Sequence, residues 1–262
     1  MIARLESMSR RIRREIIEMA HRSRGPHVGS ALSCADILAV LYGAELCLDP
    51  WAERDICILS KAHAAPALYA ALAVKGIMPQ EMLTTYCQED GMLPAHLDRK
   101  TGHGVECSAG SLGHGFGIGL GMAFGFKKNG SERRVFMIIG DGEAQEGSVW
   151  EGALFAPRQE LDNVTVIMDC NNLQAYGRPE EICSFEPMVS KWQAFGWHVC
   201  ETDGHDHRAL LDAVQEDSQG KPKMIIARTT KGKGVSFMED QLIWHYYIVT
   251  DEHRKAALEE IG

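Results

Sequence analysis

Two apolar runs that each end in polar residues constrain the fold of this chain most. Residues 134–139 are predicted to form a buried strand that leads into Gly140-Asp141-Gly142, and residues 164–168 a second strand before Asn171-Asn172. Residues 147–160 between them are predicted to be helical, with Val149, Ala153, Leu154 and Ala156 on one side. This succession predicts two parallel strands joined by a right-handed crossover. Asp141 and Asn171 would then lie beyond the carboxyl ends of neighbouring strands, where open α/β sheets bind ligands.

The residue types at that edge suit a hard cation. Carboxylate and amide oxygens are ligands for Mg²⁺, which takes about six oxygens and often completes its shell with water and substrate phosphates. Gly140 and Gly142 carry no side chain, so a phosphate could approach the backbone closely. A tight turn and a capped strand end are the alternative explanation. The Asn pair thirty residues after Asp141 (171 − 141), and directly after a strand, favours the ligand site.

The remaining elements alternate in the same way. Further strands are predicted at 56–59, 197–200 and 224–227. Helices are predicted at 5–21, 35–46 (capped by Ser33), 64–74, 79–86, 116–128, 188–195, 207–215 and 251–261, with long loops at 88–115 and 176–187. About five strands among helices predict an α/β fold, with a mostly parallel sheet covered by helices on both faces. Because no internal linker is found, residues 1–262 are predicted to form a single domain.

Composition excludes several classes of function. The formal charge of −9 gives no basic footprint for nucleic acid. No apolar run reaches the roughly 20 residues that span a bilayer, and residues 1–20 lack a signal-peptide core. The eight cysteines include no Cys-x-x-Cys pair, and Cys57, Cys170 and Cys200 fall in apolar strands. We therefore expect reduced core cysteines in a cytoplasmic protein.

A resemblance to a known family rests on these motifs. Gly-Asp-Gly followed about thirty residues later by Asn-Asn resembles the thiamine diphosphate motif of thiamine-dependent enzymes, and residues 140–147 are similar to transketolase in particular. Other segments match the N-terminal part of that family in the same order: residues 26–29, 60–64, His96, 104–106, 110–115, 231–234 and 244–245. The resemblance covers nearly the whole chain and implies the diphosphate-binding domain of the thiamine diphosphate-binding fold.

The resemblance also implies roles for residues. Asp141, Asn171 and the main-chain carbonyl of Leu173 would hold Mg²⁺ (Ca²⁺ and Mn²⁺ being alternatives), which bridges the diphosphate. The implied cofactor contacts are His63, Gly110, Ser111, Leu112, Gly142, Asn171 and His245. The implied catalytic residues are His27, His63, His96, Glu146 and His245. Of these, His27, His96 and His245 would line the substrate channel as hydrogen-bond donors and proton carriers, and the family counterpart of Glu146 faces the activating glutamate of a partner.

The sequence departs from the family at several points. Val28 follows His27 where the family has proline, and Tyr246-Tyr247 follow His245 where it has a glycine-rich loop. His114 stands in place of a glutamine, and neither it nor His103 receives a role. No stretch matches the family's second, pyrimidine-binding domain. The resemblance therefore implies a separately encoded C-terminal subunit, in an α₂β₂ assembly that transfers a two-carbon ketol unit between sugars or sugar phosphates.

Two other functions stay open at this point. The chain could belong to another two-chain thiamine diphosphate enzyme, such as a 2-oxo acid dehydrogenase component or a synthase of the 1-deoxyxylulose phosphate kind. Release of CO₂ from a 2-oxo acid would favour that alternative. The chain could also be a non-catalytic binding relic, against which the intact Asp141, Asn171, His63 and Glu146 argue.

Overall fold

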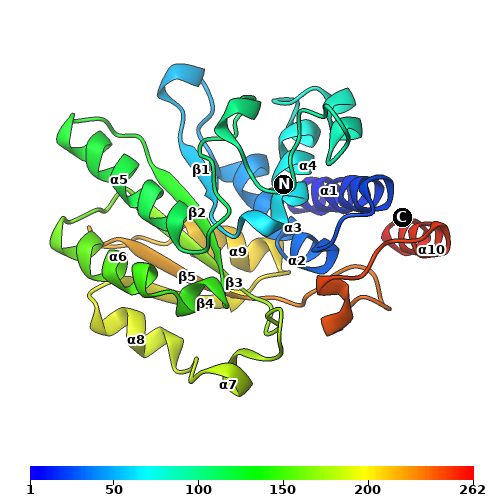
Figure 1. The fold of residues 1–262 in the computed structure, drawn as a ribbon. Coiled ribbons are helices and arrows are strands. Elements are labelled where there is room, and N and C mark those ends of the chain that lie inside the picture. The colour runs from blue at the N-terminus through cyan, green and yellow to red at the C-terminus, as the bar shows by residue number, and fades with distance from the viewer.

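The computed structural model describes residues 1–262 and contains one five-stranded sheet (Figure 1). All strand pairs are parallel, in the order β1-β2-β3-β5-β4. The strands are β1 (Ile56–Leu59), β2 (Val135–Gly140), β3 (Val164–Cys170), β4 (His198–Asp203) and β5 (Lys223–Arg228). The predicted α/β fold class is confirmed, and each predicted strand is present.

Helices cover both faces of the sheet (Figure 1). On one face α5 (His114–Lys128) packs on β1 and β2, α6 (Gly147–Arg158) packs on α5, and α8 (Met188–Ala194) packs on β4 and β5. On the other face α9 (His207–Gln215) packs on β4 and β5, while α1 (Ile2–Ser23), α3 (Ala35–Val40) and α4 (Ala65–Lys75) pack on one another. α10 (Asp251–Ile261) lies against α1. The remaining short elements are α2 (Val28–Ser33), α7 (Pro179–Ile182), η1 (Leu41–Glu45), η2 (Trp51–Glu53), η3 (Ala62–Ala64), η4 (Gln80–Thr85), η5 (Arg99–Thr101), η6 (Glu143–Gln145) and η7 (Leu242–His245).

The central β2–α6–β3 unit has the predicted geometry. β2 and β3 are adjacent and parallel, and Gly140 at the end of β2 pairs with Asp169 near the end of β3. Both strands are almost entirely buried, as expected for the middle of a parallel sheet with two covered faces. Asp141 and Asn171 therefore leave the sheet at the same edge.

The predicted helix 35–46 with a Ser33 cap is wrong in detail. The structure has α2, then α3, then the π-helical turn η1. Ser33 ends α2, and its hydroxyl donates a hydrogen bond of 2.6 Å to Oδ2 of Asp169, 136 positions away in the chain. Capping preferences describe local partners only, so they could not show this distant one.

The helix predicted at 79–86 is present as a 3₁₀ helix over Gln80–Thr85. Two further predictions need correction. Leu154 is 61% exposed, although it was predicted to share the apolar side of α6, because it lies about 100° around the helix from buried Ala153. All eight cysteines are free, but Cys47, Cys87 and Cys183 are exposed, so the cysteines are not uniformly core residues. None of the helices has the length and apolar character needed to cross a membrane.

Candidate functional site

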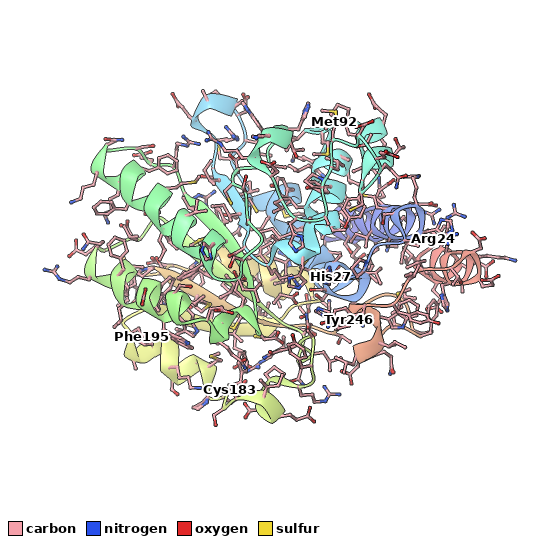
Figure 2. All side chains as sticks on the ribbon, viewed as in Figure 1. Arg24, His27, Met92, Cys183, Phe195 and Tyr246 are labelled. Atoms are coloured by element: carbon pink, nitrogen blue, oxygen red, sulfur yellow. The ribbon has the colours of Figure 1, made fainter.

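A pocket of about 480 Å³ lies at the carboxyl ends of the central strands. It collects residues from distant parts of the chain, and the side chains of His27 and Tyr246 lie next to one another beside it (Figure 2). Ser111 is exposed and does not line the pocket, and His103 and His114 lie outside it. The candidate residues that do line it are His27, His63, His96, Gly110, Leu112, Asp141, Gly142, Glu146, Asn171, Leu173 and His245.

The turn after β2 fixes the carboxylate of Asp141. Its Oδ1 accepts a hydrogen bond of 2.7 Å from the Gly142 amide, and its Oδ2 accepts one of 2.8 Å from the Asn172 amide. Because Asn172 follows β3, the second bond joins the two strand ends directly. Burial, together with the nearby charge of Asp169, raises the pKa of Asp141 to about 6. The Asp141 carboxylate is thus held in a buried position that disfavours its charged form, and a bound cation would stabilise that form.

The loop after β3 supplies further oxygen atoms. Oδ1 of Asn171 accepts from the Leu173 amide at 3.1 Å, which orients the carboxamide. The carbonyl oxygen of Leu173 faces a positive charge, because it accepts a hydrogen bond of 3.0 Å from Nζ of Lys231. A carboxylate, an amide oxygen and a main-chain carbonyl make a donor set that suits Mg²⁺. No three His, Cys, Asp or Glu side chains come together as a metal site, so the structure offers no softer ligand set.

Four histidines that line the same pocket cluster around His27. The His27 ring centroid lies 5.0 Å from that of His245, 5.3 Å from that of His63 and 6.4 Å from that of His96. The main chain supports this arrangement, because the His27 amide donates a 2.9 Å hydrogen bond to the His245 carbonyl. His27 has a φ of 73°, a conformation that is uncommon outside glycine and that the surrounding contacts must maintain.

Burial favours the neutral form of three of these rings, those of His27, His63 and His245, by lowering the pKa of each. It lowers the pKa of His27 to about 4, with His96 and Lys231 adding to the effect, and the pKa of His245 to about 3, with Lys231 as the next cause. It also lowers the pKa of His63 well below its usual value. A neutral imidazole has one donor and one acceptor nitrogen. Nδ1 of His245 lies 2.8 Å from Nζ of Lys231, which can only donate, so the ring proton of His245 is on Nε2.

Lys231 contacts two residues that line the pocket, Leu173 and His245, a position that the sequence did not reveal. It is 1% exposed, and its ammonium group bonds the Leu173 carbonyl and His245. Burial, with the charge of Lys61 next, lowers its pKa to about 8. Its position in a Lys-Gly-Lys-Gly loop suggested a solvated loop as readily as a ligand site. The structure shows a buried cation that bridges Leu173 and His245 behind the pocket lining.

A second buried lysine, Lys61, lines the pocket itself. Lys61 forms an ion pair with Asp169 and donates to the Ser30 carbonyl at 3.0 Å. Burial by itself would lower the pKa of Lys61, but the charge of Asp169 reverses this and raises it. Ser30 also hydrogen-bonds Nε2 of His63 at 2.8 Å. The ion pair thus connects β3 with the segments that carry His63 and Ser30.

Glu143 was also missed. It is 2% exposed, and it accepts hydrogen bonds from the Ser60 hydroxyl, the Gly113 amide and the Gly140 amide. It is the residue directly after the Gly-Asp-Gly motif, and an acidic side chain at that position gave no separate indication of a role. By contrast Glu146, the predicted site residue, is exposed at the start of α6 and lines the pocket.

His205 and His207 contact a buried carboxylate, that of Asp36. Nδ1 of His205 lies 2.8 Å and Nε2 of His207 lies 3.3 Å from Asp36. Arg13 pairs with the same carboxylate. This cluster connects α1 and α3 with the start of α9, away from the pocket.

The fold and the pocket define an α/β domain whose carboxyl edge carries a pocket lined by oxygen-bearing side chains and a cluster of histidines, as a cofactor-binding domain would. Residues 5–260 match the family model described as "Transketolase, thiamine diphosphate binding domain". The chain therefore belongs to the transketolase family and is its thiamine diphosphate-binding part.

Two named relatives and one solved structure support the same family assignment. The chain is 42% identical to the 6-deoxy-6-sulfo-D-fructose transketolase subunit SqwG of a Clostridium species, over 98% of this chain and 96% of that one. It is 41% identical to an apulose-4-phosphate transketolase subunit from Actinobacillus succinogenes, over 98% and 95% of the two chains. The transketolase structure from Campylobacter jejuni superimposes with a TM-score of 0.92 at 30% identity, and the match covers all of this chain but 43% of that one. The chain thus matches the named subunits over nearly their whole length, and the Campylobacter chain over less than half.

Proposed function

We propose that this chain is the N-terminal, diphosphate-binding subunit of a two-chain transketolase, and that residues 1–262 form its single domain. The observation that carries the proposal is the position of Asp141 and Asn171 at one edge of the sheet, in the same pocket as the cluster of histidines. Relatives of nearly equal length are named transketolase subunits, which favours this reaction over that of a 2-oxo acid dehydrogenase.

The pocket would hold thiamine diphosphate through a divalent cation. Asp141, Asn171 and the Leu173 carbonyl would bind Mg²⁺, and Gly142 and His63 would contact the diphosphate. Lys231, a buried cation beside the same carbonyl, would add a charged donor to a phosphate oxygen. Gly110, Ser111 and Leu112 would lie along the pyrimidine end. When bound, thiamine diphosphate supplies a thiazolium ring that accepts the electron pair of a broken carbon–carbon bond.

The histidines would act on the substrate. The rings of His27, His63, His96 and His245 can donate to sugar hydroxyls or take up a proton, and Lys231 leaves Nε2 of His245 as a donor. Glu146, exposed at the start of α6, would face the partner subunit and not the sugar.

A partner subunit would cover the pocket mouth. Large apolar side chains surround it and are exposed in this chain alone: Tyr176 at 85%, Tyr246 at 56% and Ile182 at 44%. A separately encoded pyrimidine-binding subunit in an α₂β₂ assembly would bury them and supply the activating glutamate. A cytoplasmic location is part of the proposal, since exposed thiols such as Cys47 and Cys183 persist in a reducing compartment.

The substrates would be a ketose donor and an aldose acceptor. The two subunit relatives carry the names of different sugars, a sulfonated fructose and apulose 4-phosphate. The activity screen therefore includes both of these ketoses beside ordinary ketose phosphates, with one panel of aldose acceptors.

The test combines this chain with its candidate partner, thiamine diphosphate and Mg²⁺, and follows ketol transfer. We expect transfer with both chains and none with this chain alone. Turnover by the single chain would contradict the shared site, and CO₂ release from a 2-oxo acid would support the other enzyme class.

The metal assignment has its own test. Asp141→Ala should abolish Mg²⁺-dependent cofactor binding, measured by calorimetry with the partner present, while the far-ultraviolet circular dichroism stays unchanged. Asp212→Ala changes an exposed aspartate on α9 and serves as the matched control. If Asp141→Ala binds as tightly as the wild type, the metal assignment is wrong.

A further inference from the structure

The carboxylate of Glu143 joins three segments that come from separate parts of the chain. Its Oε1 accepts hydrogen bonds of 2.5 Å from the Ser60 hydroxyl and 2.8 Å from the Gly113 amide, and its Oε2 accepts one of 3.3 Å from the Gly140 amide. With 2% of its surface exposed, Glu143 has almost no water to replace these donors. A carboxylate is the side chain that can accept from three donors without presenting one of its own.

Each segment leads to a different part of the pocket. Ser60 follows β1 and precedes His63 by three positions, and Gly140 ends β2 immediately before Asp141. Gly113 ends the segment 110–113, which contributes Gly110 and Leu112 to the pocket lining. The Glu143 carboxylate therefore fixes the relative positions of three parts of the pocket. These are the segment that carries His63, the turn at Asp141 and the segment 110–113.

The segment 110–113 depends on Glu143 more than the two strand ends do. Strands β1 and β2 are held together by the main-chain hydrogen bonds of the sheet. In addition, the Ser60 amide donates a 2.8 Å hydrogen bond to the Ile138 carbonyl. Within 110–113, the bond from the Gly113 amide to Glu143 is the one hydrogen bond that reaches outside the segment and the adjoining start of α5. Gly113 has a φ of 80° and a Cβ there would meet Ser148, so its backbone is confined to this geometry.

We propose that Glu143 is a positioning residue that holds the segment 110–113 against the Asp141 turn and thereby shapes the pocket for the cofactor. This inference rests on the proposed function, because the cofactor is the ligand whose binding the segment serves. In this role Glu143 acts through the backbone that it holds, because its two carboxylate oxygens are taken up by the Ser60, Gly113 and Gly140 donors.

The test uses Glu143→Gln, which keeps the shape of the side chain. A carboxamide has a single accepting oxygen, and its NH₂ group would face at least one N–H donor. With the partner subunit present, we expect the dissociation constant of thiamine diphosphate to rise roughly ten- to a hundredfold, as for loss of a charge-assisted hydrogen bond. At saturating cofactor kcat should stay within about twofold of wild type, because the reacting groups are unchanged. Hydrogen exchange in the cofactor-free chain should accelerate at the Gly113 amide.

Two further variants complete the design. Glu132→Gln makes the same chemical change at an exposed glutamate without hydrogen bonds and should leave affinity and exchange unchanged. Glu143→Asp keeps the charge but is one methylene shorter, so it should show the same effects at smaller amplitude. If Glu143→Gln does not fold, the same measurements on Glu143→Asp provide the test.

The outcomes separate this inference from the function. Failure of the wild-type complex to bind thiamine diphosphate would defeat the proposed function. Wild-type binding together with unchanged affinity and unchanged exchange in the Glu143 variants would overturn the positioning role alone. A loss of kcat at saturating cofactor with unchanged affinity would also overturn it, since that pattern indicates a part in the chemistry.

Discussion

Removing either partner of the Lys61–Asp169 ion pair alone should strongly destabilise the fold. Lys61 is 1% and Asp169 is 0% exposed. Asp169 also accepts hydrogen bonds from the hydroxyls of Ser33 and Thr229. Removing one partner of a buried pair leaves an uncompensated charge away from water, which costs about 3–5 kcal/mol.

A double-mutant cycle measures this dependence. Lys61→Met should lower the free energy of unfolding by about 3–5 kcal/mol, because Asp169 keeps its charge and loses the cation. Asp169→Asn should cause a similar loss, since Lys61 then has no counter-charge. The double variant removes both charges, so its loss should fall short of the sum of the two single losses by at least about 2 kcal/mol.

The assay is urea unfolding followed by circular dichroism, in the absence of cofactor, with comparison of midpoints at constant m. The matched control is the surface pair Lys127–Asp162, at 2.8 Å with side chains 35% and 49% exposed. Lys127→Met and Asp162→Asn should show a coupling below about 1 kcal/mol. Losses at the buried pair that add to within about 0.5 kcal/mol would refute the reasoning.

Three more predictions follow from single contacts. Lys231→Met should weaken thiamine diphosphate binding by roughly 10- to 100-fold in calorimetry with the partner, because a charge-assisted hydrogen bond contributes about 1.5–3 kcal/mol; equal affinity would remove Lys231 from the cofactor site. Burial opposes the charge of Asp36, but two histidines and Arg13 outweigh it and hold its pKa well below the usual range. Its stabilisation is therefore complete above about pH 5 and is lost as pH falls below that value, so Asp36→Asn should flatten the decline of the urea midpoint between about pH 5 and 3, whereas parallel declines would contradict this. Tyr246 lies 4.7 Å from the His245 ring, so Tyr246→Gly should change KM for the ketose without changing cofactor affinity, and a change in both would place it elsewhere in the site.

The sheet was predictable because each strand is a short apolar run between turn residues. β1, α9 and α10 have the bounds that the sequence predicted, and the remaining strands and longer helices differ by a few residues at their ends. Asp141 and Asn171 were brought to one edge by an argument that needed only parallel strands. Local pattern and topology sufficed for these features.

The interior of the site was not predictable in the same way. Lys61 and Asp169 are 108 positions apart, and neither sequence neighbourhood shows that the other will lie beside it. Glu143 and Lys231 resembled ordinary polar loop residues, because their burial is produced by segments that fold over them from elsewhere. Leu154 shows the converse, an apolar residue in a helical pattern that the fold leaves in solvent.

The main-chain bond between His27 and the carbonyl of His245 has a consequence for biosynthesis. A ribosome adds about 5–20 residues per second, and the segments nearer the N-terminus emerge first. This bond and the Lys231 contacts need residues beyond position 230. The pocket can therefore be completed only after most of the polypeptide has left the exit tunnel. The vitamin-derived coenzyme therefore meets a nearly complete polypeptide, and it cannot serve as a template for the early steps of folding.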